Sequence, residues 1–405
     1  MTNFDKLEVL SPAGDLERLA SAITFGADAV YLAGKEFGMR AGAANFSNED
    51  LEKAVKLAHD NNVKIYLTCN TLPRNDEIEK LPEYLKFVQS VGIDAVIASD
   101  IGVLSLIKKY TPNMEVHIST QAGIVNYATA QAFYDMGAKR IVLARELSLA
   151  EISQIRDKVP KDMDIEVFVH GAMCVSFSGR CLLSNYLTGR DANRGECAQP
   201  CRWGYHLVEE KRPNEFFPIF EDEHGSYILN AKDMCMIEYI DKLAQAGVTS
   251  FKIEGRSKSS YYVAVITNAY RNAVDQFVKS PDDFVVDPWL LEEVQKVSHR
   301  QYSTGFYIDT PTQFYENGGY IRQYDVIAIV NSSKDGMLYC TQKNKFCVND
   351  VVEILQPKSK SFEMKINAIY DEFGTEINEA PHALMSVSIP CENTVLPGSI
   401  IRKAN

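Results

Sequence analysis

The stretch LEVLSPAGDLERLASAITFG, residues 7–26, joins an apolar segment to an amphipathic one through a Pro-Gly loop. Residues 7–14 have the composition of a buried strand, and residues 15–26 carry apolar side chains at helical spacing. Asp15 is placed to cap the N-terminus of this helix, and Gly26 follows its last turn. A strand followed by a helix at this spacing is the βα unit of a parallel sheet.

The same pattern recurs as far as residue 256. Further strands are predicted, mostly with helical patterns between them, at residues 27–34, 63–70, 94–99, 115–122, 139–146, 164–172 and 248–256. About eight βα units over roughly 250–270 residues have the size of a TIM barrel. An open doubly wound sheet is less favoured, because the SPAGD loop is not the GxGxxG loop of dinucleotide-binding sheets. We therefore expect an α/β fold with a TIM-like (β/α)8 barrel.

The character of the sequence changes beyond the barrel. Short apolar segments separated by turns such as KDG and LPG predict a small C-terminal all-β barrel domain. We therefore expect three parts: the TIM-like barrel at residues 1–279 with a Cys-rich insertion at 173–235 after strand seven, a connecting segment at 280–322, and the small β-barrel domain at 323–405.

Charge and hydropathy restrict the classes of function. The 405 residues carry a formal net charge of −12, which argues against indiscriminate nucleic-acid binding but leaves room for a local basic groove. No apolar run approaches the ~20 residues of a membrane span. The N-terminal MTNFDKLEV lacks the features of a secretory signal, so we expect a cytoplasmic protein. In that reducing environment the nine cysteines are not expected to form structural disulfides.

Four cysteines are crowded into the insertion: Cys174, Cys181, Cys197 and Cys201. Zinc ribbons favour tight Cys-x2-Cys pairs, whereas the spacings here are Cys-x6-Cys and Cys-x3-Cys, so zinc is the less favoured metal. Four thiolates suit an iron–sulfur cluster, and buried or redox-active thiols are the remaining alternative. The best candidates are Cys174, Cys181 and Cys197, with Cys235 or Cys201 as the fourth ligand.

Polar residues at the C-terminal ends of the predicted strands are the candidates for chemistry in a TIM barrel. They include Arg40, Asn70, Gln121, Arg145, His170 and Arg256, with Arg180 in the insertion. Arginine presents a planar fork to carboxylate or phosphate, so several at one barrel end indicate an anionic ligand. Alternatively, the arginines pair with the nearby Glu36, Glu146 and Glu254. Histidine has an unperturbed pKa of about 6.5, which suits proton transfer at neutral pH.

One motif is specific to a family. The pattern Glu166-x-Phe168-x-x-Gly171-Ala172-Met173-Cys174-x4-Gly179-x-Cys181-x-Leu183-Ser184 resembles the signature of the collagenase-like U32 peptidase family. The resemblance extends over about residues 7–265 and includes LSPAGDLERL, ADAVYLAGKEFGMRA, HISTQ, RDANRGECAQPCRW, LNAKDMC and FKIEGR. The C-terminal β module is also typical of the longer members of the family.

The resemblance implies more than one activity. The family was named for reported proteolysis, but other branches perform oxygen-independent hydroxylation of a tRNA wobble uridine, a ribosomal RNA cytidine or ubiquinone precursors. Those branches carry a [4Fe–4S] cluster, and prephenate is implicated as their oxygen source. Length, the single cysteine set and the C-terminal module are most similar to the tRNA branch. By motif, Cys174, Cys181 and Cys197 match ligand positions, Cys235 matches a fourth ligand of the ubiquinone-related branch, and Cys201 stays an alternative.

We therefore expect an iron–sulfur tRNA-modifying enzyme that forms 5-hydroxyuridine from a prephenate-like dicarboxylate, with the tRNA anticodon arm as partner. The expected catalytic residues are His170, Arg145 and Arg256, and the expected substrate-binding residues are Arg40, Asn70, Gln121 and Arg180. A peptidase is the first alternative. The sequence lacks HExxH and GxSxG, although Cys174 with His170 is a conceivable nucleophile and base. A non-enzymatic assembly partner that carries a cluster is the second alternative.

Overall fold

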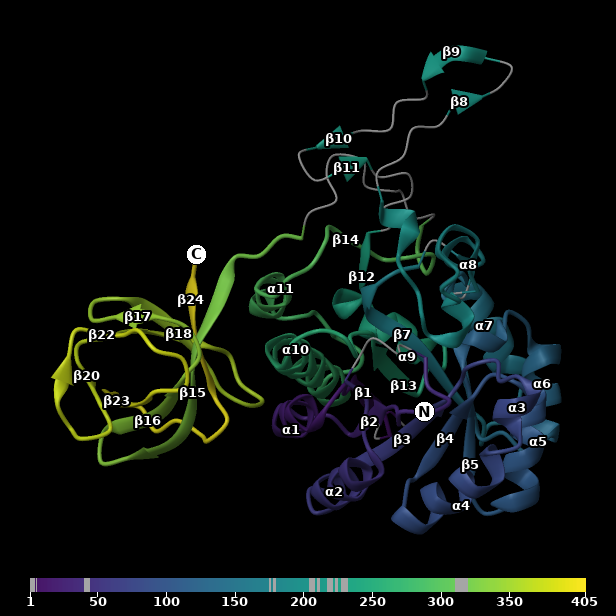
Figure 1. Ribbon diagram of the computed structural model, residues 1–405, viewed down its shortest axis with the longest axis horizontal. Helices are drawn as coiled ribbons and strands as arrows, with labels where there is room; N and C mark the ends of the chain where they lie inside the picture. Colours follow the sequence, from purple (N-terminus) through teal and green to yellow (C-terminus); the bar gives the residue numbers. More distant parts are fainter. Residues whose placement is uncertain are drawn as a thin grey trace.

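Eight parallel strands close into a barrel in the computed structural model (Figure 1). They are β1 (Glu8–Pro12), β2 (Ala29–Leu32), β3 (Lys64–Cys69), β4 (Ala95–Ala98), β5 (Glu115–Ile118), β6 (Arg140–Val142), β7 (Asp164–Ala172) and β13 (Ser250–Ile253). Each strand pairs with the next, and β13 pairs with both β7 and β1, which closes the sheet. The predicted TIM-like barrel is confirmed.

The structure describes residues 4, 6–39, 44–174, 176–177, 180–203, 208–209, 212–216, 221–222, 225–226, 232–309 and 320–405. Within these ranges, no helix combines the length and the apolar character needed to cross a membrane.

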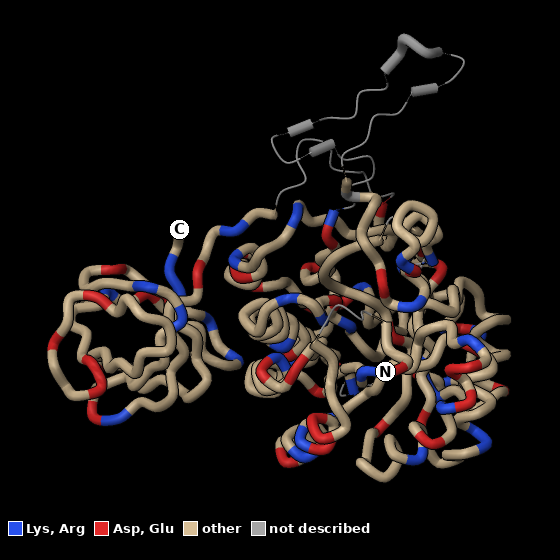
Figure 2. The backbone as a smooth tube through the Cα atoms, in the orientation of Figure 1, with Lys and Arg blue, Asp and Glu red and all other residues tan. Residues whose placement is uncertain are grey.

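Helices surround the barrel (Figure 1). They are α1 (Leu16–Thr24), α2 (Asn48–His59), α3 (Asn75–Ile78), α4 (Leu81–Val91), α5 (Ile101–Tyr110), α6 (Tyr127–Asp135), α7 (Leu149–Lys158), α9 (Ile240–Gln245) and α10 (Ser260–Lys279). The carboxylate of Asp15 accepts a hydrogen bond from the backbone N–H of Arg18, as expected of the cap of α1. Leu19 and Ala22 of this helix are buried against the barrel. Acidic and basic side chains are interspersed along the outer helices (Figure 2).

The insertion between β7 and β13 adds one of its described strands to the barrel sheet. Its elements are α8 (Leu183–Thr188), the 3-10 turns η3 (Ala192–Arg194) and η4 (Pro200–Arg202), and the short strands β8 (Val208–Glu209), β9 (Arg212–Phe216), β10 (Glu221–Asp222), β11 (Gly225–Ser226) and β12 (Asp233–Cys235). Strand β12 runs antiparallel to the end of β7, with Cys235 opposite His170, and parallel to β14 (Tyr302–Ser303). Cys235 therefore lies on a strand, immediately before the 3-10 turn η5 (Ile237–Tyr239) that leads to α9.

The C-terminal domain follows helix α11 (Pro288–Gln295) and is all β, as predicted. Its main sheet is antiparallel and curls into a half-barrel around its own apolar core. The strands are β15 (Tyr324–Lys334), β16 (Met337–Gln342), β17 (Phe346–Cys347), β18 (Val351–Leu355), β19 (Phe362–Lys365), β20 (Ile369–Tyr370), β21 (Glu376–Ile377), β22 (Glu379–Ala380), β23 (Ser386–Pro390) and β24 (Ile400–Ala404).

Buried charges join the two domains. The fully buried guanidinium of Arg402, on β24, contacts Glu293 of α11 at 2.5 Å and Glu353 of β18 at 2.6 Å. Lys296, just after α11, adds a contact of 2.8 Å to Glu353. The side chain of Asn268, on α10, donates to the carbonyl oxygen of Ser359 at 3.0 Å. These contacts hold the C-terminal domain against α10 and α11, beside the barrel (Figure 1).

Candidate active site at the barrel mouth

Four of the predicted residues line one pocket at the C-terminal end of the barrel strands, which we call the mouth: Asn70, Gln121, Arg145 and Arg256. Asn70 directly follows β3, and Gln121 lies in the 3-10 turn after β5 (η1, Thr120–Ala122). The side chain of Asn70 accepts from the backbone N–H of Met39 at 3.1 Å and donates to the hydroxyl of Ser119 at 3.4 Å. The structure thus brings together residues that are far apart in the sequence, because parallel strands all end at one side of the barrel.

Both mouth arginines are buried and held in fixed orientations. The guanidinium carbon of Arg145 lies 4.4 Å from the centre of the Phe168 ring, and its Nη1 donates to the carbonyl oxygen of Ala172 at 2.9 Å. Arg256 donates to the side-chain oxygen of Asn45 at 2.7 Å. A planar guanidinium held in a fixed orientation presents several donors, which suits a carboxylate or phosphate ligand.

A third cation belongs to the mouth and was not predicted from the sequence. Lys252, on β13, also lines the pocket, and its ammonium lies 4.4 Å from the centre of the Tyr31 ring. The signal was present in FKIEGR, because alternate residues of a strand share one face. Lys252, Glu254 and Arg256 have this spacing, and all three line the mouth. The prediction considered only the arginine at the strand end.

The insertion reaches the mouth through Arg180. Its Nε donates to the backbone carbonyl oxygen of Gln121 at 2.7 Å, and the side chain is exposed. Arg180 therefore lies at the rim rather than among the residues that line the pocket. Arg40, the remaining predicted substrate-binding residue, lies outside the described residues.

Beneath the mouth the barrel interior contains charges. Arg140 contacts Glu8 at 2.5 Å and Glu166 at 3.1 Å, and Lys252 contacts Glu166 at 2.6 Å. Burial raises the pKa of Glu8, but Arg140 and hydrogen bonds, including one from Tyr66, outweigh it and lower the pKa to about 2. The pKa of Glu166 is likewise lowered, because Lys252 and Arg140 outweigh the effect of burial. Both carboxylates are therefore ionised, and Lys252 connects this network to the pocket.

His170 does not line the mouth pocket, because a bulge interrupts strand β7. Glu166 and Phe168 face the barrel interior, and strict alternation would place His170 with them. In the pairing with β13, however, Lys252 is opposite Phe168 while the next residue, Ile253, is opposite His170. The extra residue between them turns His170 to the outer face of the barrel.

On that outer face His170 is buried among tyrosines. Its Nδ1 lies 3.4 Å from the hydroxyl of Tyr270, and its Nε2 lies 3.3 Å from the hydroxyl of Tyr302. Burial, helped by the nearby His299 and Lys258, lowers the pKa of His170 to about 3. The imidazole is therefore neutral at physiological pH. Its predicted catalytic role stays a prediction, and its position outside the pocket does not support that role.

The sulfur atoms of three cysteines of the insertion accept hydrogen bonds. The sulfur of Cys174 accepts from the backbone N–H of Ser176 at 3.4 Å, and that of Cys197 accepts from the backbone N–H of Gln199 at 3.4 Å. Burial raises the pKa of Cys181, but hydrogen bonds from the Ser176 side chain and from backbone N–H groups outweigh it and lower the pKa. For Cys181 these hydrogen bonds favour the charged form, which is the form that binds metals.

The proposed fourth ligands differ from these three. Cys235 packs on the outer side of β7 near Tyr270, and burial raises its pKa to about 11, so it is a neutral thiol at physiological pH. Cys201 is half-buried in the 3-10 turn η4. Across the described part of the chain, no three His, Cys, Asp or Glu side chains are grouped closely enough to hold a metal ion. The donor chemistry of Cys174, Cys181 and Cys197 fits a soft metal or a cluster, and the gathering of a complete ligand set stays a prediction.

Family models match nearly the whole chain. The model described as peptidase family U32 matches residues 14–317, and the model of the peptidase family U32 C-terminal domain matches residues 322–402. The mouth, the insertion and α10 all lie within the first match, and the half-barrel lies within the second.

Several curated proteins are similar over most of their length. The tRNA hydroxylation protein P1 of Bacillus subtilis is 38% identical over 403 residues, which cover 98% of this chain and 95% of that protein. The tRNA hydroxylation protein P of Escherichia coli is 38% identical and covers 87% of each chain. An uncharacterized protease of Methanocaldococcus jannaschii is 40% identical and covers 88% of this chain and 92% of that protein.

Proposed function

The chain belongs to peptidase family U32, and on that basis we propose that it is an enzyme that hydroxylates RNA at the mouth of its barrel. Two full-length relatives are named for tRNA hydroxylation, which supports tRNA as the substrate. The finer proposal is that the target is the wobble uridine of the anticodon and that the product is 5-hydroxyuridine. Such a substrate would place the protein in the cytoplasm.

The observation that carries the proposal is the set of three cations at the mouth, Arg145, Lys252 and Arg256. Two fixed guanidinium groups and an ammonium suit a small dicarboxylate, and we propose a prephenate-like compound. Replacing C5–H of uridine by C5–OH adds one oxygen atom and removes two electrons from the base. We propose that the dicarboxylate delivers the oxygen and accepts those two electrons. Asn70 and Gln121 would orient the ligands through their amides.

We also propose a [4Fe–4S] cluster, which when bound would supply one-electron transfer. Cys174, Cys181 and Cys197 would hold it, with Cys235 as the fourth ligand and Cys201 as the alternative. Backbone N–H groups donate to the sulfurs of Cys174 and Cys197, and hydrogen bonds lower the pKa of Cys181, which favours its thiolate. Cys235 would have to lose its thiol proton to bind the cluster, and its burial opposes that loss.

The peptidase alternative rests on the family name and on the relative named as a protease. A cysteine peptidase needs a base that reaches its thiol. Both ring nitrogens of His170 lie near tyrosine hydroxyls, and the residue is buried on the outer face of the barrel. This arrangement gives Cys174 no base from His170, so we favour the hydroxylase.

The test measures tRNA nucleosides by mass spectrometry in cells that lack this protein and any close paralogue. We expect 5-hydroxyuridine to disappear, to return with the wild-type chain, and to stay absent with Cys174→Ala. Cys347→Ala, in the C-terminal domain, is the matched control and should restore it. Unchanged 5-hydroxyuridine in the deletion strain would exclude tRNA hydroxylation. Gelatin cleavage lost in Cys174→Ala would support the peptidase instead.

Cluster content is measured separately. Protein purified without oxygen should be brown, and each chain should contain about four iron and about four acid-labile sulfide ions. The Cys347→Ala control should keep this content, whereas Cys174→Ala should lose most of it. Colourless protein with full hydroxylation activity would overturn the cluster and leave the hydroxylase standing.

A further inference from the structure

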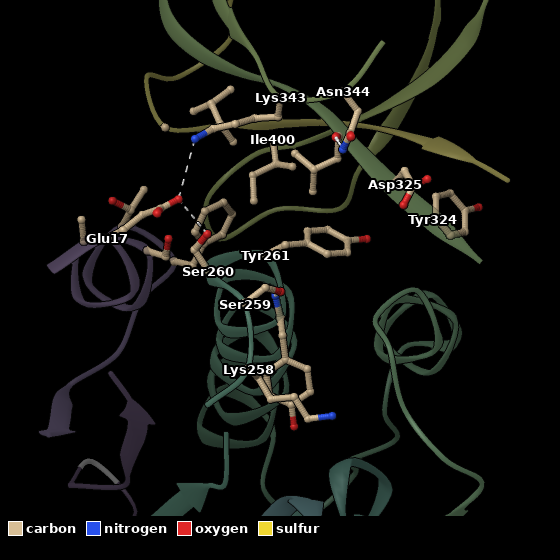
Figure 3. Close-up of a pocket in the computed structure, with 18 of the residues that line it drawn as sticks. Glu17, Lys258, Ser259, Ser260, Tyr261, Tyr324, Asp325, Lys343, Asn344 and Ile400 are labelled. Carbon is tan, nitrogen blue, oxygen red and sulfur yellow. Dashed lines mark hydrogen bonds and ion pairs between the residues drawn. The ribbon is translucent and has the colours of Figure 1, made fainter. Parts of the chain in front are cut away.

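A cleft of about 830 Å³ lies between the barrel and the C-terminal domain (Figure 3). One wall is formed by α1, the loop at residues 257–259 and the start of α10, and the other by β15, β16 and β24. The Arg402 network and the Asn268–Ser359 hydrogen bond join the two domains. The cleft therefore lies between two domains, and buried contacts hold these domains together.

The lining of the cleft mixes apolar and polar side chains and includes three cations, Lys258, Arg322 and Lys343. Two carboxylates, Glu17 and Asp325, also line it, so the basic groups are in excess by one. The ammonium of Lys258 contacts the carbonyl oxygen of Ser298 at 3.4 Å and lies 4.3 Å from the centre of the Tyr320 ring. Its contacts are thus with groups other than carboxylates, and its charge can serve an anionic ligand.

The first turn of α10 adds to this positive wall. Ser259 caps the helix, and its side chain accepts from the backbone N–H of Tyr262 at 3.2 Å. The other N–H groups of a first turn have no partner within their helix, and a helix of 20 residues carries a positive dipole end there. Together with Lys258 this end favours phosphate, and the Tyr261 and Tyr324 rings in the same cleft offer surfaces on which bases can stack.

The cleft and the mouth share one loop. Glu254 and Arg256 line the mouth, and Ser257, the next residue, already lines the cleft. One peptide bond therefore separates the residues that line the two pockets. A ligand long enough to leave the mouth across this loop would enter the cleft, whereas a small dicarboxylate would fill only the mouth.

We propose that the cleft binds the sugar–phosphate backbone of the RNA strand that continues from the nucleotide in the mouth. This inference rests on the proposed function and names a second binding site for the same substrate. Lys258, Lys343 and the first turn of α10 contact phosphates. Contacts of this kind give affinity and position without reading sequence.

Glu17 opposes RNA binding in this arrangement. It lies 3.9 Å from the ammonium of Lys343 and accepts a hydrogen bond from the hydroxyl of Ser260 at 3.0 Å, so it connects the two walls of the cleft (Figure 3). A phosphate that binds the ammonium of Lys343 must displace the carboxylate of Glu17 from it. Removing the charge of Glu17 should therefore strengthen binding, and reversing the charge of Lys343 should weaken it.

The experiment measures the affinity of the full chain for an anticodon stem–loop RNA by fluorescence anisotropy over a range of salt concentrations. We expect Lys343→Glu to weaken binding about tenfold and to lower the salt dependence by about one phosphate contact. Lys334→Glu is the matched control, because it makes the same charge change at an exposed position of the same domain and should leave the affinity unchanged. Glu17→Gln should bind several-fold more tightly, whereas Glu49→Gln, exposed on α2, should not.

The outcomes separate the two proposals. A wild-type chain that neither binds nor hydroxylates tRNA would overturn the proposed function and this inference together. Hydroxylation with equal affinities for Lys343→Glu and Lys334→Glu would overturn the inference alone. Binding of inorganic phosphate that depends on Lys343, with unchanged RNA affinity, would show a small-anion site and would also overturn it. Thermal melting of each variant confirms that the fold is intact.

Cross-linking gives a measurement that needs no variant. Ultraviolet irradiation of the complex, followed by mass spectrometry, should attach RNA to peptides that contain Tyr261, Tyr324 or Asn344. Cross-links confined to the insertion, with none in these cleft peptides, would contradict the proposal.

Discussion

The barrel interior and the domain interface each bury two basic and two acidic side chains, but the two networks serve different ends. The lumen network consists of Glu8, Arg140, Glu166 and Lys252, and the interface network consists of Glu293, Lys296, Glu353 and Arg402. In the lumen all four residues belong to one domain, and Lys252 also lines the mouth. In the interface the charges come from two domains, and Arg402 donates to two carboxylates and to the hydroxyls of Tyr261 and Ser361.

This difference indicates what each network can affect. Loss of a charge in the lumen disturbs the folding of the barrel and, through Lys252, the ligands of the mouth. Loss of a charge in the interface disturbs the docking of the C-terminal domain and, through the cleft, the proposed contacts with the RNA backbone. Buried ion pairs add little net stability, but removing one partner leaves a charge that is buried and uncompensated. Single substitutions in each network therefore test this difference.

Arg140→Met should have the largest effect. It leaves Glu8 and Glu166 buried, with Lys252 as the remaining cation near Glu166. We expect a loss of about 3–5 kcal/mol in the free energy of unfolding of the barrel, measured by urea denaturation. The neighbouring Lys139→Met is the control, because Lys139 is 56% exposed and its contact with Asp162 is 3.7 Å, and it should cost under about 1 kcal/mol. Equal costs for the two variants would contradict the importance of the lumen network.

Arg402→Met should cost somewhat less, about 2–4 kcal/mol, because Glu353 keeps its contact of 2.8 Å with Lys296. The loss should fall on the docking of the C-terminal domain. Hydrogen exchange should therefore become faster in α11 and β24 and stay unchanged in the barrel strands. The neighbouring Lys403→Met, at a side chain that is 40% exposed, is the control and should leave exchange unchanged. Faster exchange throughout the barrel would remove the distinction between the two networks.

The lumen network and the cleft also show what the sequence could predict. Alternating strands and helices predicted the barrel, and the rule that residues at strand ends face the mouth predicted the positions of Asn70, Gln121, Arg145 and Arg256. The outward turn of His170 could not be predicted, because a bulge of one residue leaves no mark in an apolar run such as EVFVH. The cleft could not be predicted either, since it joins residues 17–25 with residues 322–344 and 398–400, and no local pattern connects such distant segments.

Lys252→Met tests the connection between the lumen and the mouth. Glu166 would still have Arg140 at 3.1 Å, so the stability cost should be smaller than that of Arg140→Met. The loss of one mouth cation should instead lower hydroxylation about 100-fold, which corresponds to about 2.7 kcal/mol. The measurement is 5-hydroxyuridine formation at several concentrations of the dicarboxylate. Lys64→Met, at an exposed residue at the start of β3, is the control. A variant with full activity would show that Lys252 serves the fold alone.

A dependence on pH, small between one pH unit and the next, should also differ between the networks. The pKa of Glu8 is lowered to about 2, because Arg140 and hydrogen bonds outweigh the opposing effect of burial. A carboxylate with a pKa lower in the folded than in the unfolded chain adds stability above its unfolded pKa of about 4.3, and that stability is lost as the pH falls toward the folded pKa. The stability difference between the wild type and Glu8→Gln should thus be largest above about pH 4.5. It should shrink by up to about 1.4 kcal/mol per pH unit between there and pH 2.

Glu353→Gln supplies the comparison for the interface. The pKa of Glu353 is also lowered, since Lys296 and Arg402 outweigh the effect of burial, but it is lowered by less than the pKa of Glu8. The difference in free energy of unfolding between the wild type and Glu353→Gln is measured by urea denaturation at pH 3, 4, 5 and 7. It should depend less on pH than the difference between the wild type and Glu8→Gln. If the two dependences were equal, the closed interior of the barrel would shield its charges from water no better than the junction between domains does. Exclusion of water from the lumen could then not explain an effect of the Lys252 charge on a ligand in the mouth.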